Sequence, residues 1–193
     1  MEYTYNNPDS VKEKILLAGI EEIQKNGIQD FSLRKVATRC GVSCAAPYKH
    51  FKDKKDLIRS IIQYINIQWH MRQSKVVKKF QGNVRKQLTQ ISLEYIKFLV
   101  ENPHFRSIIM LKDDSMDNET IKMKSNLSDC TKNLIDEYCE SVNMDYKTRK
   151  VKTFIVRSFI YGAALMFDNG ELEYNECNLK FIEKSIDREF DLK

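Results

Sequence analysis

The segment from residue 31 to 57 restricts the folds open to this chain more than any other. Two short helical patterns flank the sequence Gly41-Val42-Ser43. Ser32 is placed to cap the first helix, and Gly41 stands where a helix end favours a residue that tolerates positive φ. The apolar positions of that first helix lie at helical spacing, at Leu33, Val36, Ala37 and Cys40. A helix, a tight turn with glycine and a second helix predict a DNA-binding helix-turn-helix.

The second helix is expected to begin at Ser43 or Cys44 and to end near Phe51. Pro47 cannot lie deep in this helix, so the helix should begin no more than about one turn before it. Between residues 31 and 55 there are seven basic residues and a single acidic one, Asp53. The net charge of this segment, +6, exceeds the +5 of the whole chain. Basic residues concentrated on so small a module suit a phosphate backbone.

The order of residues in this segment resembles the DNA-binding signature of the TetR family of transcriptional regulators. The pattern from residue 32 to 57 is Ser-x-x-x-Val-Ala-x-x-Cys-Gly-Val-Ser-x-x-x-x-Tyr-x-His-Phe-x-x-Lys-x-x-Leu. Cys40 stands where the family usually has alanine, and Pro47 where it often has leucine, and neither change removes a phosphate ligand. Chain length and the separate helical C-terminal half are also similar to that family.

The resemblance implies roles for individual residues of the segment. Phosphates are expected to be held by Ser32, Tyr48, His50 and Lys54, with backbone amides at the start of the next helix near residue 53. The positions expected to face bases are Cys44, Ala45, Ala46 and Lys49. Lys49 can donate to guanine, and an alanine methyl can meet a thymine methyl. Arg34, Lys35 and Ser43 complete the expected DNA-contacting set.

The whole chain is expected to be all-α, with about nine helices and two domains. Six glycines and three prolines are few, and alternating β-type runs are scarce. The first helix should follow a cap at Asp9 or Ser10, where Glu13 completes a capping box. Further helices are expected near 53–79, 84–101, 104–111, 119–142, 145–167 and 175–190, with a polar loop at 112–118. The expected domains are 9–69, with its helix-turn-helix at about 32–51, and a ligand-binding and dimerisation domain at 70–193.

The helix expected over 145–167 is apolar nearly all round from residue 151 to 167, so this part must be covered on more than one side. The segment 157–162 resembles the eighth helix of TetR-like proteins, which pairs with the ninth across a two-fold axis. The expected interface residues are Arg157, Ser158, Tyr161, Gly162, Leu165, Phe181 and Ile182. A homodimer would present two recognition helices to a palindromic operator in double-stranded DNA. A monomeric bundle core is the alternative.

Aromatic and soft side chains are plentiful in the middle helices. The resemblance implies a cavity there for a small-molecule effector, and such a lining suits an apolar or aromatic molecule. The candidate lining residues are Trp69, Tyr95, Phe98, Phe105, Met110, Met123 and Phe154. For each of them alone, packing in an ordinary core is the competing interpretation.

The sequence gives little indication of an enzyme or of a metal site. The common nucleotide, hydrolase and zinc-protease motifs are missing from the sequence. We therefore expect no catalytic residue and no cofactor. Five scattered cysteines indicate free thiols, and a metal site or redox switch at Cys40, Cys44 and His50 is a minor alternative.

The N-terminus is polar and no stretch is long and apolar enough to span a membrane, so a cytoplasmic protein without membrane contact is expected. The sequence thus predicts a DNA-binding transcriptional regulator, most often a repressor in this family, released from its operator by a small molecule. One alternative is a DNA-binding regulator without an effector, controlled by abundance or thiol oxidation. Another is a helical interaction protein with a vestigial DNA module.

Overall fold

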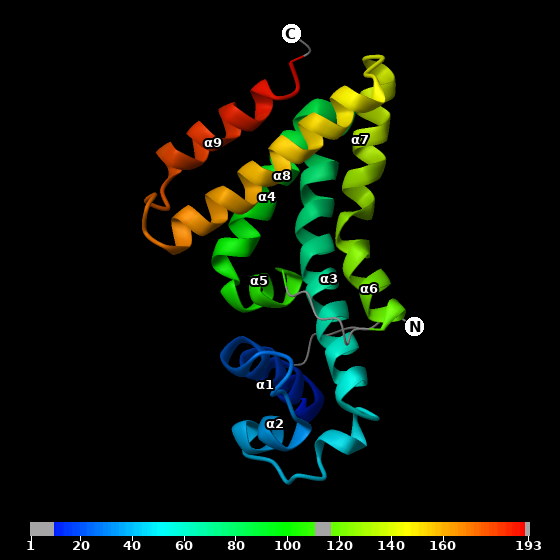
Figure 1. Cartoon of the computed structure of the whole chain (residues 1–193), viewed down its shortest axis with the longest axis vertical. Coiled ribbons are helices and arrows are strands. Elements are labelled where there is room, and N and C mark those ends of the chain that lie inside the picture. The colour runs from blue at the N-terminus through cyan, green and yellow to red at the C-terminus, as the bar shows by residue number, and fades with distance from the viewer. Residues whose placement is uncertain (1–9, 111–116, 192–193) are drawn as a thin grey trace. The chain divides into compact units, whose positions relative to one another are not determined.

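The computed structural model describes residues 10–110 and 117–191, and every regular element in these ranges is a helix (Figure 1). The expected all-α class is confirmed. The elements are α1 (Val11–Asn26), α2 (Leu33–Cys40), η1 (Pro47–Lys49), α3 (Lys54–Lys79), α4 (Val84–Glu101), α5 (Pro103–Met110), α6 (Asn118–Ser125), η2 (Asn126–Ser128), α7 (Asp129–Ser141), α8 (Tyr146–Asp168) and α9 (Glu176–Arg188). The expected cap at Asp9 and most of the polar loop at 112–118 lie outside the described residues.

Local side-chain caps fix where several of these helices begin. The Ser10 hydroxyl oxygen accepts from the Glu13 backbone N–H at 3.1 Å, as the capping box predicts. Asn83, Asp145 and Asn175 cap α4, α8 and α9 in the same way. Because each cap satisfies an amide that has no partner inside the helix, these starts are defined by sequence neighbours alone.

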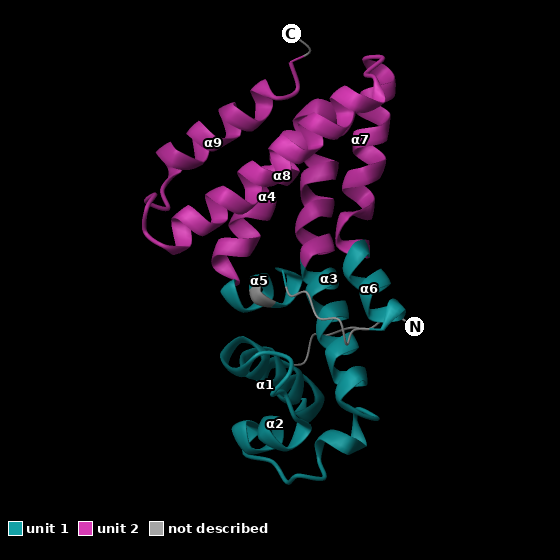
Figure 2. Ribbon diagram, viewed as in Figure 1, with its two compact units in different colours: residues 1–68, 103–125 teal, residues 69–102, 126–193 magenta. Residues whose placement is uncertain are grey.

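The chain divides into two compact units (Figure 2). Unit 1 comprises residues 1–68 and 103–125, and unit 2 comprises 69–102 and 126–193. α3 therefore contributes its first part to unit 1 and its last part to unit 2. The segment 103–125 groups with the helix-turn-helix region, which the sequence did not lead us to expect. The domain division at residues 69 and 70 stays a prediction.

Unit 1 is built on α1, which packs against α2 and α5. Leu16 of α1, Val36 of α2 and Leu57 of α3 are completely buried. A Cβ atom added at Gly19 would lie 3.0 Å from the Ile61 side chain. A larger residue would fit there only if the end of the Ile61 side chain moved by a few tenths of an ångström, so glycine gives the tightest packing at a small cost in helix propensity.

Unit 2 is built around α4, which packs against α7, α8 and α9. Arg85 of α4 donates to both carboxylate oxygens of Asp187 of α9, from Nε at 3.2 Å and from Nη2 at 2.9 Å. The Tyr138 hydroxyl of α7 donates to the Phe190 carbonyl at 2.6 Å. Lys152 of α8 donates to the Glu189 carbonyl at 2.7 Å, where a cation stabilises the end of α9. Hydrogen bonds have a defined geometry, so these bonds fix how the helices of unit 2 are oriented against one another, which apolar contacts alone do not.

The single helix expected over 119–142 is wrong, because the short 3₁₀ turn η2 divides it into α6 and α7. Two carbonyl groups around this break accept hydrogen bonds from α3. In unit 1, Asn66 Nδ2 donates to the Met123 carbonyl at 2.8 Å. In unit 2, Trp69 Nε1 donates to the Leu127 carbonyl at 3.0 Å. Both carbonyl groups thus have hydrogen-bond partners on α3, outside the segment of α6, η2 and α7.

Candidate nucleic-acid interface

α2 begins and ends where its sequence predicts. The Ser32 hydroxyl oxygen accepts from the Lys35 backbone N–H at 3.2 Å, which caps the helix start. Gly41 lies in the left-handed region with φ 69°, and its N–H and that of Val42 return to carbonyl groups in the last turn of α2. The helix and its turn therefore form a defined platform for the residues that follow.

The second helix of the motif differs from the prediction. Residues 44–46 form a turn, and only Pro47–Lys49 are helical, as the 3₁₀ element η1. Ala46 N–H donates to the Ser43 carbonyl at 2.9 Å and His50 N–H to the Pro47 carbonyl at 3.0 Å, so both bonds span three residues. Pro47 is buried and has no N–H for the four-residue bond of an α-helix. The expected α-helix from Ser43 or Cys44 to Phe51 is thus replaced by a tighter and shorter element.

Most of the expected DNA contacts lie on the surface of this region. Tyr48 is 61% exposed. The other exposed members of the set are Arg34, Lys35, Ser43, Cys44, Ala45, Lys49 and His50, while Ser32, Ala46 and Lys54 are half-buried. The turn and η1 therefore offer short side chains at 43–46 and long polar ones at 48–50. Such a surface can offer methyl and hydroxyl groups to bases and cationic groups to phosphates.

Arg39, although basic, is engaged inside unit 1. Its guanidinium Nη2 donates to the Glu22 carboxylate of α1 at 2.8 Å. Glu22 is buried and also accepts from Asn26 Nδ2 at 2.7 Å. Burial acts to raise the pKa of Glu22, but the hydrogen bonds from Arg39 and Asn26 outweigh it and hold the pKa below its ordinary value. This pair joins α2 to α1. One of the seven basic residues between 31 and 55 therefore has a structural role that does not involve DNA.

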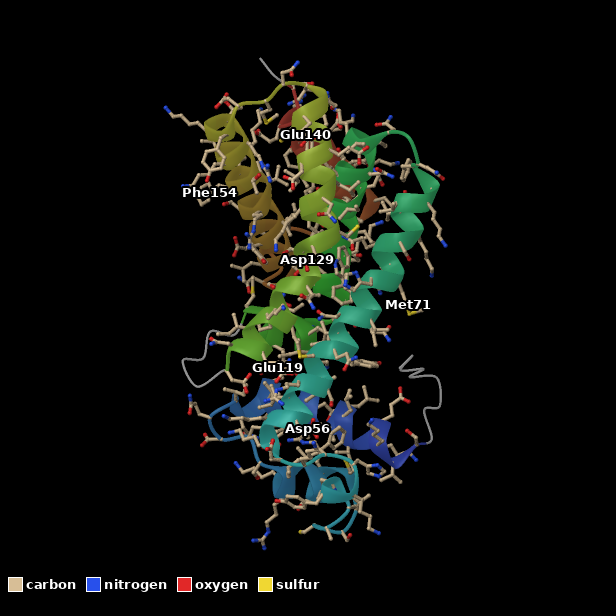
Figure 3. The ribbon with its side chains drawn as sticks, turned by 90° about the vertical axis from the view of Figure 1, so that its right-hand side faces the viewer. Asp56, Met71, Glu119, Asp129, Glu140 and Phe154 are labelled. Atoms are coloured by element: carbon tan, nitrogen blue, oxygen red, sulfur yellow. The ribbon has the colours of Figure 1, made fainter. Side chains whose placement is uncertain are left out.

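The start of α3 is less open to phosphate than the sequence indicates. Asp53 Oδ1 accepts from the Asp56 backbone N–H at 2.9 Å, and Asp56 Oδ2 accepts from the Lys52 N–H at 2.8 Å. Two carboxylates therefore occupy part of the amide set that was expected to face a phosphate, and Figure 3 labels Asp56 at this helix start. Their negative charge also meets the positive end of the helix dipole.

Two lysines of the expected DNA set converge on the connector between α1 and α2. Lys35 Nζ donates to the Asp30 carbonyl at 3.1 Å, and Lys54 Nζ donates to the Gln29 carbonyl at 3.2 Å. The Lys54 ammonium group also lies 6.0 Å from the centre of the Phe31 ring. Both ammonium groups are thereby held against the connector of residues 29–31, which leads directly into Ser32.

One cysteine of this region, Cys40, makes a hydrogen bond inside unit 1. Cys40 Sγ donates to the Lys14 carbonyl at 3.4 Å, and burial, aided by the charge of Glu21, raises the pKa of its thiol. In the ranges that the structure describes, no three His, Cys, Asp or Glu side chains are grouped for a metal ion. A raised thiol pKa is the reverse of what a redox-sensing cysteine needs.

The expected effector residues separate into two groups. In unit 2, the Trp69 ring lies 4.7 Å from Tyr95 and 5.5 Å from Phe98, centre to centre. Burial and a hydrogen bond with Tyr161 raise the pKa of Tyr95. In unit 1, Phe105 meets Tyr64 edge to face at 6.0 Å, Met123 is half-buried and Met110 is exposed.

Phe154 does not line an interior site within unit 2. It is 71% exposed, and Figure 3 shows it on the outer side of α8. Its apolar ring and its helical position fit a core and a partner surface equally well, so the sequence could not distinguish the two.

The expected dimerisation residues are mostly exposed. Leu165 is 54% exposed and Phe181 is 63% exposed, while Arg157, Ser158 and Gly162 lie at the surface of α8. Tyr161 is half-buried. Ile182 is buried in unit 2 and is therefore not available in this conformation. Val151, Phe159 and Met166 of α8 are exposed apolar residues that the sequence analysis did not assign.

Comparison with known proteins supports the helix-turn-helix independently of this geometry. Residues 15–61 match the family described as bacterial regulatory proteins, tetR family. A TetR family transcription regulator from Marinobacter aquaeolei VT8 has a similar structure, with a TM-score of 0.76, 19% identity and coverage of 92% of this chain and 94% of that one. None of the helices in the described residues is long and apolar enough to cross a membrane.

Two further solved structures share the fold. The transcriptional regulator FadR from Bacillus subtilis in complex with stearoyl-CoA gives a TM-score of 0.69 at 17% identity, over 92% of this chain and 96% of that one. Superantigen PfiT gives 0.70 at 14% identity, over 94% and 96%. Proteins that are described in different ways thus share this fold. Structural similarity at such low sequence identity establishes the fold of this chain and not its function.

Residues 15–61 thus match the helix-turn-helix of the tetR family of bacterial regulatory proteins, and the all-α chain has the fold seen in TetR family transcription regulators.

Proposed function

We propose that this chain is a homodimeric transcriptional repressor that leaves its operator when it binds a small-molecule effector. The observation that carries the proposal is the basic side of the helix-turn-helix, where exposed Lys35 and half-buried Lys54 are both held against the connector that leads into Ser32. Lysine ammonium groups fixed along one edge are suited to phosphates, whereas the neighbouring turn has side chains short enough to approach bases.

On DNA, phosphates would be held by Ser32, Arg34, Lys35, Tyr48, His50 and Lys54. Base edges would face Ser43, Cys44, Ala45, Ala46 and Lys49. Lys35 and Lys54 now donate to carbonyl oxygens, and a phosphate oxygen is a stronger, charged acceptor for the same groups. Because η1 is short, few base pairs can be read by one copy, which favours a two-fold pair of copies on a palindrome.

The dimer would form through α8 and α9. Leu165 and Phe181 are large apolar side chains that unit 2 leaves exposed. Exposed apolar side chains grouped on two helices are typical of surfaces that bind another protein. A second copy is the partner that the two-fold geometry of operator reading requires.

The effector would be apolar or aromatic. The Trp69, Tyr95 and Phe98 rings give unit 2 an aromatic cluster suited to such a molecule. The structurally similar FadR is described with stearoyl-CoA, which is a precedent for a long apolar ligand on this fold. α3 begins beside η1 and carries Trp69, so an effector that prefers one setting of α3 would change DNA affinity through this helix.

The deciding experiment is a gel shift with the upstream region of the chain's own gene. Specific retardation that survives a large excess of random duplex, and that falls steeply with salt, is expected. A thermal-shift screen of acyl compounds, flavonoids and drug-like cations would then supply effectors for release from the same DNA. A protein that ignores this DNA even in dilute buffer would contradict the proposal.

A thiol-responsive regulator is the second candidate, and Cys44 is the observation that favours it. This cysteine is exposed in the turn that would face bases, so its oxidation would change the contact surface directly. Replacing Cys44 with serine separates the two functions. If the protein is thiol-responsive, the serine variant should no longer respond to peroxide in the gel shift. If the protein responds to a small-molecule effector, the variant should still be released from DNA by that molecule.

A further inference from the structure

Gly162 lies in the middle of α8, and its own chain gives no reason for a glycine there. It is exposed, and its φ angle is not positive. In the described part of the chain, a Cβ atom added at Gly162 would meet nothing within 4 Å. Glycine inside a helix lowers the stability of that helix relative to alanine. The bare backbone at Gly162 is therefore open to a side chain from another molecule.

Phe154, two helical turns before Gly162, is a large side chain without a place in unit 2. It is 71% exposed, and Ser158, midway between the two, is exposed as well. Residues spaced by four form a ridge along a helix, so these three positions share one row. Val151 and Leu165 lie on the same face and are 50% and 54% exposed. The row thus runs from a large side chain through a small one to none at all.

The charges of α8 are divided between its two ends. Residues 146–157 include five basic residues and no acidic one, whereas 165–176 include four acidic residues and no basic one. Lys147, Lys150 and Glu171 are among the exposed members of these groups. A helix favours the opposite distribution, because its dipole attracts anions to the start and cations to the end. Two antiparallel copies of α8 would bring unlike charges together, and two parallel copies would bring like charges together.

We propose that α8 pairs with α8 of a second copy in an antiparallel arrangement, with the two-fold axis at Ser158 and Phe154 of each copy seated against Gly162 of the other. Phe154 and Gly162 are each four residues from Ser158, so rotation about this axis exchanges their positions. Helices that pack through rows of this spacing cross at about 50°. This inference rests on the proposed function, because it specifies how the dimer of the regulator is built.

The test exchanges the two residues in the full chain and measures the dimer dissociation constant by analytical ultracentrifugation. Gly162→Phe would set two rings against each other, and Phe154→Ala would leave the space at Gly162 empty. Each change should raise the dissociation constant about tenfold or more. The double variant Phe154→Ala/Gly162→Phe again has one ring against one small residue, so it should return close to the unaltered value.

A rescue of this kind identifies contact between copies. Phe154 and Gly162 are about 12 Å apart along one helix, so the two changes cannot compensate each other within one chain. Tyr146→Ala is the matched control. Tyr146 is an aromatic residue of α8 that is 77% exposed, but it lies about 120° around the helix from Ser158. Its replacement should leave the dissociation constant unchanged.

Disulfide crosslinking measures the position of the axis separately. Ser158→Cys is introduced with the exposed thiols removed by Cys44→Ser and Cys177→Ser. A disulfide requires Cβ atoms about 4 Å apart, so mild oxidation should join two copies through position 158. Asn133→Cys, at an exposed position of α7, should not crosslink in the same background.

Each contrary result has a defined meaning. A double variant no tighter than its weaker parent, or a Ser158→Cys chain that forms no covalent dimer, would overturn the α8 pairing. If Gly162→Phe does not fold by circular dichroism, crosslinking decides alone. An unaltered chain that is a monomer would contradict the proposed dimer altogether. A dimer that Phe181→Glu dissociates but Gly162→Phe does not would overturn only the register of α8.

Discussion

The Arg39 guanidinium donates to the buried Glu22 carboxylate at 2.8 Å, so a charged pair joins α2 of the helix-turn-helix to α1. Glu22→Gln should lower the free energy of unfolding at pH 7 by about 1–3 kcal/mol, because the partner charge is lost and a strong hydrogen bond is weakened. Glu21→Gln is the control: Glu21 is exposed and 3.6 Å from Arg39, and its replacement should cost little.

The same pair gives stability a defined dependence on pH. The pKa of Glu22 is lower in the folded chain than its ordinary value of about 4.3, so the unfolded chain takes up a proton first as the pH falls. The stabilisation from Glu22 is fully present above that ordinary value and is lost as the pH falls through the lower, folded pKa. Urea unfolding should show the difference between the native chain and Glu22→Gln shrinking below about pH 4. A difference that stays constant would contradict the assignment.

Ser32 should contribute to stability through its cap on α2, in addition to the DNA contact that the proposed function gives it. Ser32→Ala removes the hydroxyl that accepts from the Lys35 N–H, which should cost about 1 kcal/mol and lower the Tm by about 2–4 °C. Ser43→Ala is the control, because Ser43 is exposed in the turn and the proposed function gives it a DNA contact. This control should leave the Tm unchanged in differential scanning calorimetry. A drop of equal size in both variants would show that Ser32 has no special capping role.

Helix starts could be read from the sequence because their causes are local. Ser10, Ser32 and Asp145 each accept from the amide three residues later, which is a relation within one turn. The break between α6 and α7 could not be read in this way. Its partner is the Trp69 indole, 58 residues before Leu127, and only the folded chain brings them together.

The candidate site was predicted unevenly for similar reasons. The exposed basic residues follow from a motif with fixed spacing, so their surface positions were foreseeable. The pairing of Arg39 with Glu22 and the hydrogen bonds from Lys35 and Lys54 to the connector carbonyls depend on packing between elements, which the sequence does not encode locally. Phe154 shows the remaining limit, since an apolar residue on a helix fits a core or a partner surface equally well.

Pro47 should set the length of the recognition element. Pro47→Leu restores an amide N–H that can donate to the Ser43 carbonyl, so residues 43–51 should extend toward a regular α-helix. Hydrogen exchange should then show a protected amide at position 47 and stronger protection at His50. Pro47→Ala separates the two effects of the change, since it also restores the amide but leaves part of the buried volume empty. An amide at 47 that exchanges as fast as an exposed loop would contradict this account.

Lys49 and Lys54 should affect DNA binding in different ways. Lys54→Ala should weaken binding to specific and random duplexes alike and reduce the slope of log affinity against log salt by about 1. Lys49→Ala should mainly relax the preference for specific DNA. Lys78→Ala, at the opposite end of α3, removes the same charge and serves as the control. Equal effects of the Lys49 and Lys54 variants on both duplexes would refute the assignment of roles.

The exposed apolar residues of α8 and α9 should hold two copies together. Phe181→Glu places a charge on a side chain that is 63% exposed in one chain, so it should cost one copy little stability but oppose burial against a second copy. Light scattering after gel filtration should therefore give a dimer for the unaltered chain and a monomer for Phe181→Glu. Met71→Glu is the control, since Met71 is exposed on α3 and lies on the opposite side from Phe154 in Figure 3. The monomeric variant should also lose specific DNA binding, because one short recognition element reads too few base pairs. A Phe181→Glu protein that remains dimeric would place the interface elsewhere.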